Sequence, residues 1–151
     1  MALLIGFCLV TAMGIIHHFA LRALERLSGY DKNKPNRTIQ TVFFGLLSLH
    51  TLEIVGWAAA YRVILSFPAF GFLGGLVGDF DGGWADLIYF SGVQFTTLGY
   101  TQIETDGSIR LVALMQSLGG FMVLTWSATY IYSAWQRAFR LINTEDAKAK
   151  N

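Results

Sequence analysis

The sequence predicts an all-α integral membrane protein with three transmembrane helices and one shorter, re-entrant helix. Hydrophobic residues make up 54% of the 151 residues and charged residues only 14%, whereas charged residues are about 25% of a typical soluble domain. Three separate apolar stretches approach or exceed the roughly 20 residues that a helix needs to cross a bilayer. A fourth apolar stretch has only about three helical turns and is too short to span.

The first apolar stretch covers residues 1–21. It lacks a basic n-region, and no small-residue cleavage site precedes a soluble body, so we expect a retained helix and not a signal peptide. Cys8 is the single cysteine, which excludes an intrachain disulfide and predicts a lipid-facing or packed thiol. Adjacent His17 and His18 point about 100° apart on a helix. We interpret them as interfacial histidines, with a pH sensor as the alternative.

A polar connector, residues 22–37, leads to the second span at residues 38–65. His50, Glu53 and Trp57 follow one another at i, i+3 and i+7, so they share a helix face. Glu53 falls near mid-membrane, where a carboxylate usually has a partner. Three alternatives remain open for Glu53. It hydrogen-bonds the re-entrant helix or the loop behind it, it pairs with His50 or another buried polar group as a proton-sensitive element, or it joins a metal site. For a metal site, H-x-x-E supplies only two ligands.

The region after the second span predicts a pore loop. Residues 68–83 contain a proline and six glycines, and we expect them to form a loose linker. The half-length helix at residues 84–95 then leads into the threonine-rich segment 95–103, and a third span follows at residues 111–135. Irregular backbone at membrane depth is tolerated only where it is buried in protein or lines a watery cavity. Such a segment is therefore typical of a pore.

The run Thr97-Leu98-Gly99-Tyr100 resembles the first four positions of the potassium-channel selectivity filter, T-V/I/L-G-Y-G. The resemblance extends over residues 38–140, from outer helix to inner helix, and the whole chain is similar to small bacterial channel-like proteins with an extra N-terminal helix. It implies a homotetramer in which four loops present rings of backbone carbonyls that replace the water shell of the ion. The implied permeant ion is K⁺ or another monovalent cation, with no other cofactor.

The sequence departs from this pattern just beyond Tyr100. The second glycine of the family is Thr101 here, and the usual Asp is Gln102. That glycine takes a backbone conformation that a β-branched residue adopts poorly, so we expect the outermost carbonyl ring to be rotated, missing or wider. The residues that the resemblance assigns to the filter are Thr97, Leu98, Gly99, Tyr100 and Thr101. Those that would support it are Thr96, Gln102, Glu53, His50 and Trp57.

The third span contains a glycine pair and several small polar residues. Gly119 and Gly120 permit either a gating bend or a close helix contact, and the sequence favours neither. Gly120 falls about where the resembled family has its hinge glycine. Some of the polar side chains should face the cavity below the filter: Ser117, Thr125, Ser127 and Thr129. We expect the tail, residues 141–151, to be frayed.

The charges predict an orientation. Of the eleven Lys and Arg residues, five lie in the connector 22–37 and four in residues 137–150, while five of the ten acidic residues lie between the second and third spans. The positive-inside rule then places the connector and the C-terminus in the cytoplasm, and the N-terminus and the filter loop outside the cell (inner) membrane. The acidic residues either concentrate cations at a pore mouth or are ordinary loop charge. No basic aromatic patch indicates a nucleic-acid partner.

We therefore predict a passive cation channel, permeable to potassium by resemblance. The alternatives are a weakly selective cation channel and a non-conducting channel-like subunit or sensor. An enzyme acting through His50 and Glu53 has little support, because no nucleophile–base pair or complete metal set accompanies them. We expect no catalytic residue and no resident metal. The predicted organisation is an N-terminal helix and connector at 1–37, a pore domain at 38–140 and a tail at 141–151.

Overall fold

Three long helices form the body of the protein in the computed structural model, which describes residues 1–28 and 35–149, with side chains as far as residue 139. They are α1 (Ala2–Ser28), α2 (Pro35–Ser66) and α4 (Ile109–Ala149). All three are long and apolar enough to cross a membrane, which confirms the three predicted spans. Helix α1 extends beyond its predicted C-terminal end, and α2 and α4 extend beyond both of their predicted ends. Residues 29–34 of the predicted connector lie outside the described range.

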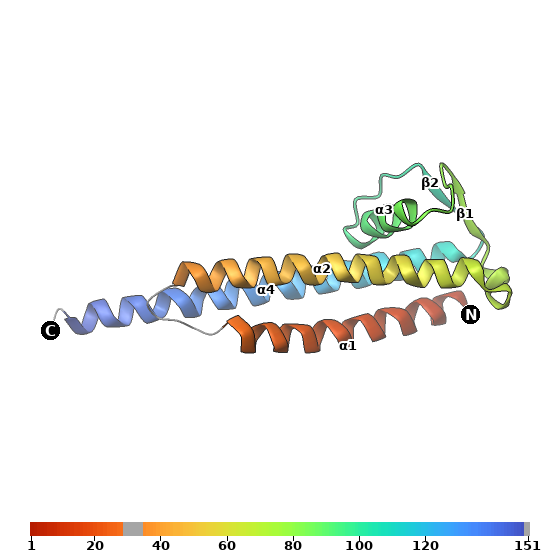
Figure 1. Ribbon diagram of the computed structural model, residues 1–151. Helices are drawn as coiled ribbons and strands as arrows, with labels where there is room; N and C mark the ends of the chain where they lie inside the picture. Colours follow the sequence, from red (N-terminus) through yellow and green to blue (C-terminus); the bar gives the residue numbers. More distant parts are fainter. Residues whose placement is uncertain (29–34, 150–151) are drawn as a thin grey trace.

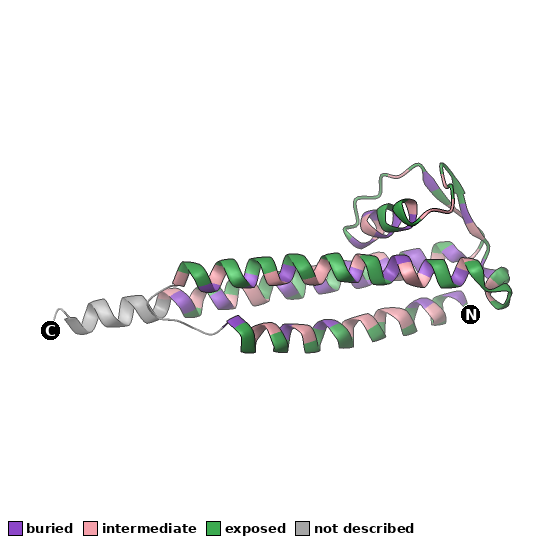
Figure 2. Ribbon diagram, viewed as in Figure 1, coloured by how far each residue is buried: buried purple, intermediate pink, exposed green. Residues whose placement is uncertain are grey.

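The helices run side by side, with α1 on one side of the α2–α4 pair and α3 (Trp84–Phe95) largely on the other (Figure 1). The N-terminus lies at the same end as the strands, and the C-terminus lies at the opposite end (Figure 1). Exposed residues follow the outward faces of the long helices (Figure 2). Many of these residues are large and apolar, as expected for surfaces that meet lipid or other membrane helices.

Helix α3 has the bounds that the sequence predicted. Its 12 residues rise about 18 Å, well short of the hydrocarbon thickness of about 30 Å. Two aspartate carboxylates accept backbone hydrogen bonds at the start of the helix. Asp81 accepts the N–H of Gly83 at 2.6 Å, and Asp86 accepts the N–H of Asp81 at 2.8 Å. Both carboxylates lie near the positive end of the helix dipole, where negative charge is stabilising.

Residues 68–83 are not the loose linker that we expected. They contain the 3₁₀ helix η1 (Pro68–Leu73) and strand β1 (Gly75–Gly78), and β1 pairs antiparallel with β2 (Ile103–Asp106). The physical reason is burial, because Leu73, Leu76 and Ile103 are removed from solvent when the two strands meet. The pairing fixes the segment that follows the predicted filter.

Helix α4 continues to Ala149, so most of the predicted tail has helical backbone and residues 150–151 lie outside the described range. Fraying of this end stays a prediction. The stretch from 142 to 149 contains no Gly or Pro and includes Ala, Glu and Lys, which are good helix formers. Nothing in the sequence stops the helix there.

The main core lies where α2, α3 and α4 meet. Ala58 and Tyr61 of α2, Leu87 and Phe90 of α3 and Val112 of α4 are completely buried. This core holds the half-length helix against the two helices that flank it. It therefore sets the position of the loop that begins at the end of α3.

Candidate functional site

The predicted filter begins in a helix-terminating turn. The N–H of Leu98 donates to the carbonyl of Val93 at 3.1 Å, and the N–H of Thr97 donates to the carbonyl of Gln94 at 3.2 Å. These two bonds form the Schellman motif that closes many helices. The motif places Thr97 at φ 57°, a left-handed conformation that costs a β-branched residue about 1–3 kcal/mol. Backbone strain is thus stored at the first residue of the predicted filter.

The residues from Thr96 to Tyr100 form a continuous exposed segment. Leu98 is 73% exposed and Tyr100 is 78% exposed. Between them, Gly99 has φ 71°, and no atom lies within 4 Å of the place where a Cβ would be. The segment is therefore anchored at its start and makes few contacts with its own chain beyond that point.

The two positions that depart from the filter pattern lead the chain into β2. The hydroxyl of Thr101 accepts the N–H of Ile103 at 3.0 Å, a local turn typical of Ser and Thr. The carbonyl of Gln102 accepts the N–H of Asp79 at 3.2 Å. A side chain at Gly78, which has φ 79°, would collide with that carbonyl. The strand pairing therefore holds this end of the loop.

A buried hydrogen-bond cluster, which the sequence reasoning missed, ties α3 to both neighbouring helices. The amide of Gln116 on α4 donates to the carbonyl of Ser91 at 3.0 Å and to its hydroxyl at 3.1 Å. The Tyr61 hydroxyl on α2 donates to the Gln116 amide oxygen at 2.8 Å. Ser91 in turn donates to the carbonyl of Ile54 at 2.7 Å. The available signal was the presence of Gln and Ser within apolar helices, where polar groups need internal partners.

The two glycines of α4 lie at close contacts on different sides of the helix. A Cβ at Gly120 would collide with the backbone of Phe95, where α3 ends, and a Cβ at Gly119 would lie 2.8 Å from a methyl group of Val10 on α1. Helix α4 runs without interruption through both positions. The structure thus places the glycine pair at packing contacts, and a gating bend at this pair stays a prediction.

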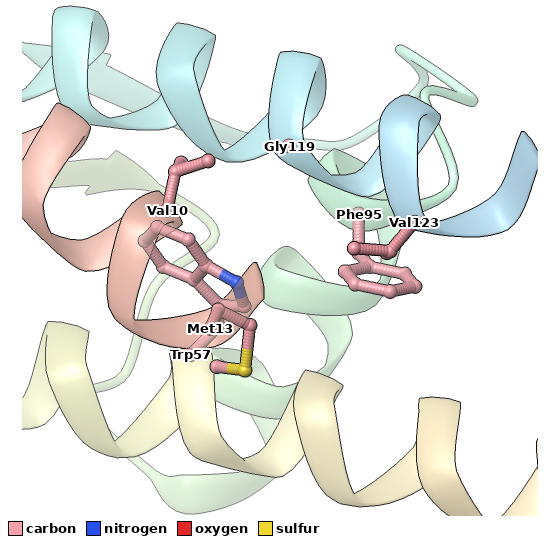
Figure 3. Close-up of a pocket in the computed structure, with 6 residues that line it drawn as sticks. All are labelled: Val10, Met13, Trp57, Phe95, Gly119 and Val123. Atoms are coloured by element: carbon pink, nitrogen blue, oxygen red, sulfur yellow. The ribbon is translucent and has the colours of Figure 1, made fainter. Parts of the chain in front are cut away.

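All four helices converge behind Phe95. A cavity of about 10 Å³ is lined by Val10 and Met13 of α1, Trp57 of α2, Phe95 of α3 and Gly119 and Val123 of α4 (Figure 3). The lining is almost entirely apolar, and a water there would lack the polar partners that it needs. Trp57, predicted to support the filter, is buried at this junction. Helix α1 therefore lines the same cavity as Phe95, the last residue of α3.

A second polar cluster lies next to this junction and consists of His17, His50 and Glu53. Nδ1 of His17 is 2.8 Å from one oxygen of Glu53, and Nδ1 of His50 is 3.0 Å from the other. His17 is 0% exposed, Glu53 2% and His50 17%. The ring of His50 also lies against Phe95, with centroids 5.9 Å apart. The cluster therefore contacts Phe95, the last residue of α3 before the predicted filter loop.

These positions bear on several interpretations of the sequence. Glu53 lies within hydrogen-bonding distance of His50, the contact named in the second of the three alternatives, and of His17 in addition; proton sensitivity and a metal site stay predictions. The interpretation of His17 as an interfacial residue was wrong, because α1 packs against α2 and α4 and buries that face. His18 is exposed, as its different direction on the helix required. Among the polar residues of α4, Ser127 is buried and lies 3.3 Å from Nε2 of His17.

Comparison with known proteins identifies a family for this chain. A family described as "Ion channel" matches residues 49–137, which include most of α2, the whole of α3, the filter loop and most of α4. The chain belongs to this ion-channel family. The chain is also 37% identical over 51 residues to an uncharacterized membrane protein, YdjJ, from Bacillus subtilis (strain 168). That match covers 33% of this chain but only 15% of the relative. No solved structure matches.

The ion-channel region contains the predicted filter loop and the Gln116 cluster but not α1. Two of the three members of the histidine–glutamate cluster, His50 and Glu53, lie inside residues 49–137, and His17 lies outside them. The cluster is therefore completed by a residue of α1, which precedes the matched region.

Proposed function

We propose that the chain is the subunit of a homotetrameric passive cation channel and that Thr97, Leu98, Gly99 and Tyr100 line its filter. The observation that carries the proposal is an exposed loop of this sequence at the end of a half-length helix, within a region that belongs to an ion-channel family. The ion would lose its water stepwise against carbonyl rings, and neighbouring ions would displace one another.

The exposure of the loop supports a symmetric assembly. One loop cannot surround an ion, so a chain with a single loop needs cyclic symmetry to build a ring. In the single chain, Leu98 and Tyr100 are largely exposed, although both are large and hydrophobic. Three further copies would cover this surface and place the four loops around one axis. Residues 38–140 would form this pore domain, and residues 1–37 would add the N-terminal helix and its connector.

The proposed orientation places the loop outside the cell membrane. The N-terminus and the strands lie at one end of the helices and the C-terminus at the other (Figure 1). Among the described residues, Arg22 and Arg26 lie toward the C-terminal end of α1, Arg37 lies at the start of α2 and Arg137 lies in the C-terminal half of α4. These ends of the helices lie away from the strands (Figure 1), and the positive-inside rule would assign them to the cytoplasm.

Potassium is the proposed ion, and a weakly selective pore is the second candidate. The observation that favours the second candidate is Thr101, whose hydroxyl is engaged in a turn with Ile103. At this position the resembled filter has glycine, which reaches conformations that threonine adopts poorly. A filter with fewer carbonyl rings would discriminate less between K⁺ and Na⁺.

Flux into liposomes that contain the purified protein tests the proposal, with K⁺ and Na⁺ gradients measured in parallel. Flux of K⁺ alone supports a working potassium filter, and flux of both ions supports the weakly selective pore. The matched control is Gly99→Ala, which should abolish flux because alanine does not hold φ 71° readily. Flux that is unchanged in Gly99→Ala would remove the assignment of the filter. Absence of flux from a folded tetramer would favour a non-conducting subunit.

A further inference from the structure

The side chains of His17, His50 and Glu53 gather three metal-binding groups at one buried point. One ring nitrogen of each histidine and one carboxylate oxygen of Glu53 all lie within 4.8 Å of one another. His17 comes from α1, whereas His50 and Glu53 are one helical turn apart on α2. The sequence alone offered only the pair on α2. The fold supplies the third group from 36 positions earlier in the chain.

The charge of Glu53 needs a neutralising partner. Its carboxylate is buried in a membrane helix, and among the described residues its ion-pair contacts are the two histidines, with no Lys or Arg. A carboxylate with two neutral imidazoles carries a net charge of −1, which is costly in an apolar interior. Either a proton or a metal cation can supply the missing positive charge.

The surroundings of His17 match those of a metal ligand. Nε2, the ring nitrogen on the far side from Glu53, lies 3.3 Å from the hydroxyl of Ser127 on α4. A metal-binding histidine almost always donates its second N–H to a carboxylate, a backbone carbonyl or water, which fixes the tautomer, and the Ser127 hydroxyl can take that place. In the tautomer in which Nε2–H donates to Ser127, Nδ1 presents a lone pair to Glu53 at 2.8 Å, and a cation fits between these two acceptors. In the other tautomer, Ser127 donates to Nε2 and Nδ1–H donates directly to Glu53.

Aromatic packing holds both imidazole rings. The rings of His17 and His50 are stacked, with centroids 5.8 Å apart and planes 13° apart. The Trp126 ring lies 5.5 Å from His17, and Phe95 lies 5.9 Å from His50. Ligands that are fixed in advance lose little freedom when an ion binds, which favours binding.

We propose that His17, His50 and Glu53 bind one divalent transition-metal ion of the Zn²⁺ type. Two imidazoles and one carboxylate are a common protein ligand set for Zn²⁺, with bonds of about 2.0–2.2 Å and a fourth position open to water. Tetrahedral bonds of that length separate ligand atoms by about 3.3 Å. Here His17 lies 2.8 Å from one oxygen of Glu53 and His50 lies 3.0 Å from the other, so an ion would be held between the two oxygens or would require the side chains to shift toward a shared one. The ion would fasten α1 to the pore domain, and this inference does not depend on whether the pore conducts.

Metal content per chain tests the proposal directly. The full-length protein, purified in detergent and stripped with a chelator, is incubated with Zn²⁺, desalted and analysed by mass spectrometry for zinc. Co²⁺ in place of Zn²⁺ gives an absorption spectrum that reports the ligands. We expect one ion per chain in the unsubstituted protein and none in Glu53→Gln or His17→Ala. The matched control, His18→Ala, removes the exposed neighbour and should keep the ion.

A further variant keeps the test valid if loss of His17 disturbs folding. His17→Cys removes the imidazole hydrogen bonds but restores a zinc ligand, so it should retain zinc and shift the Co²⁺ spectrum toward that of a thiolate site. A purely structural cluster would change stability in these variants without any change in bound metal. Failure of the unsubstituted protein to retain zinc would overturn the proposal, and so would equal retention in Glu53→Gln. In either case a shared proton, not a metal, neutralises Glu53.

Discussion

The close contact between α4 and the end of α3 leads to a quantitative prediction for Gly120→Ala. A Cβ at Gly120 would lie 2.9 Å from the carbonyl carbon and 3.0 Å from the Cα of Phe95, and it would overlap the carbonyl oxygen. Ordinary carbon–carbon contacts are about 3.5–4.0 Å, so the two carbons alone require the backbones to separate by about 0.5–1 Å, and the overlapping carbonyl oxygen requires more. Because the obstacle is backbone, no side-chain rotation can relieve it.

The expected cost follows from two opposing contributions. Overpacking of this kind lowers stability by about 1–3 kcal/mol. Because the obstructing atoms belong to the backbone, which cannot move aside as a side chain does, we expect a value in the upper part of that range. Alanine gains up to about 1 kcal/mol over glycine in a helix interior. We therefore expect Gly120→Ala to lower the free energy of unfolding by about 1–2 kcal/mol. The displaced Phe95 should also disturb the filter and lower ion flux.

Thermal unfolding in detergent and liposome flux, measured on the same preparation, check this prediction. Gly14→Ala is the matched control, because that glycine is also within a membrane helix but has nothing within 4 Å of its would-be Cβ. Gly14→Ala should be at least as stable as the unsubstituted protein and should conduct normally. If Gly120→Ala is as stable as Gly14→Ala while channel open times change, Gly120 acts as a hinge and the packing argument is refuted.

The remaining predictions concern selectivity and the two buried polar clusters. Thr101→Gly should increase the preference for K⁺ over Na⁺, and unmoved reversal potentials would show that Thr101 does not limit selectivity. Gln116→Leu should destabilise the fold by about 2–4 kcal/mol, because Tyr61 and Ser91 lose their buried partner; thermal unfolding within error of the unsubstituted protein would contradict this. Glu53→Gln should be more stable than Glu53→Ala, since an amide can still hydrogen-bond the histidines. Equal unfolding temperatures for those two variants would argue against a stabilising hydrogen bond between residue 53 and the histidines.

Much of the architecture could be predicted because the membrane imposes simple rules. Apolar length identified the three spans, and the 12 residues of α3 were too few to cross. The exact bounds of α3 followed from Trp84 at its start and the threonine-rich run after Phe95. By contrast, the pairing of β1 with β2 depends on contacts between residues about 30 positions apart. Glycine-rich composition suggested only a loose linker there.

The candidate site was harder to predict, because its parts come from different helices. Shared helix faces correctly grouped His50 with Glu53, but helix periodicity could not show that His17 of α1 would meet them. Gln116 was missed for the same reason, since its partners Tyr61 and Ser91 lie on two other helices. The left-handed conformation of Thr97 was also hidden, because it arises from the helix-ending hydrogen bonds and not from the residue type.

Current through a planar bilayer tests whether four copies of this chain form a conducting cation pore. The purified tetramer is inserted between a K⁺ solution and a Na⁺ solution, and unitary current is recorded as voltage is varied. The account predicts discrete current steps that are absent in Gly99→Ala, with a reversal potential displaced toward that of K⁺. A folded tetramer that shows no current steps at any voltage, or steps unaffected by Gly99→Ala, would contradict it.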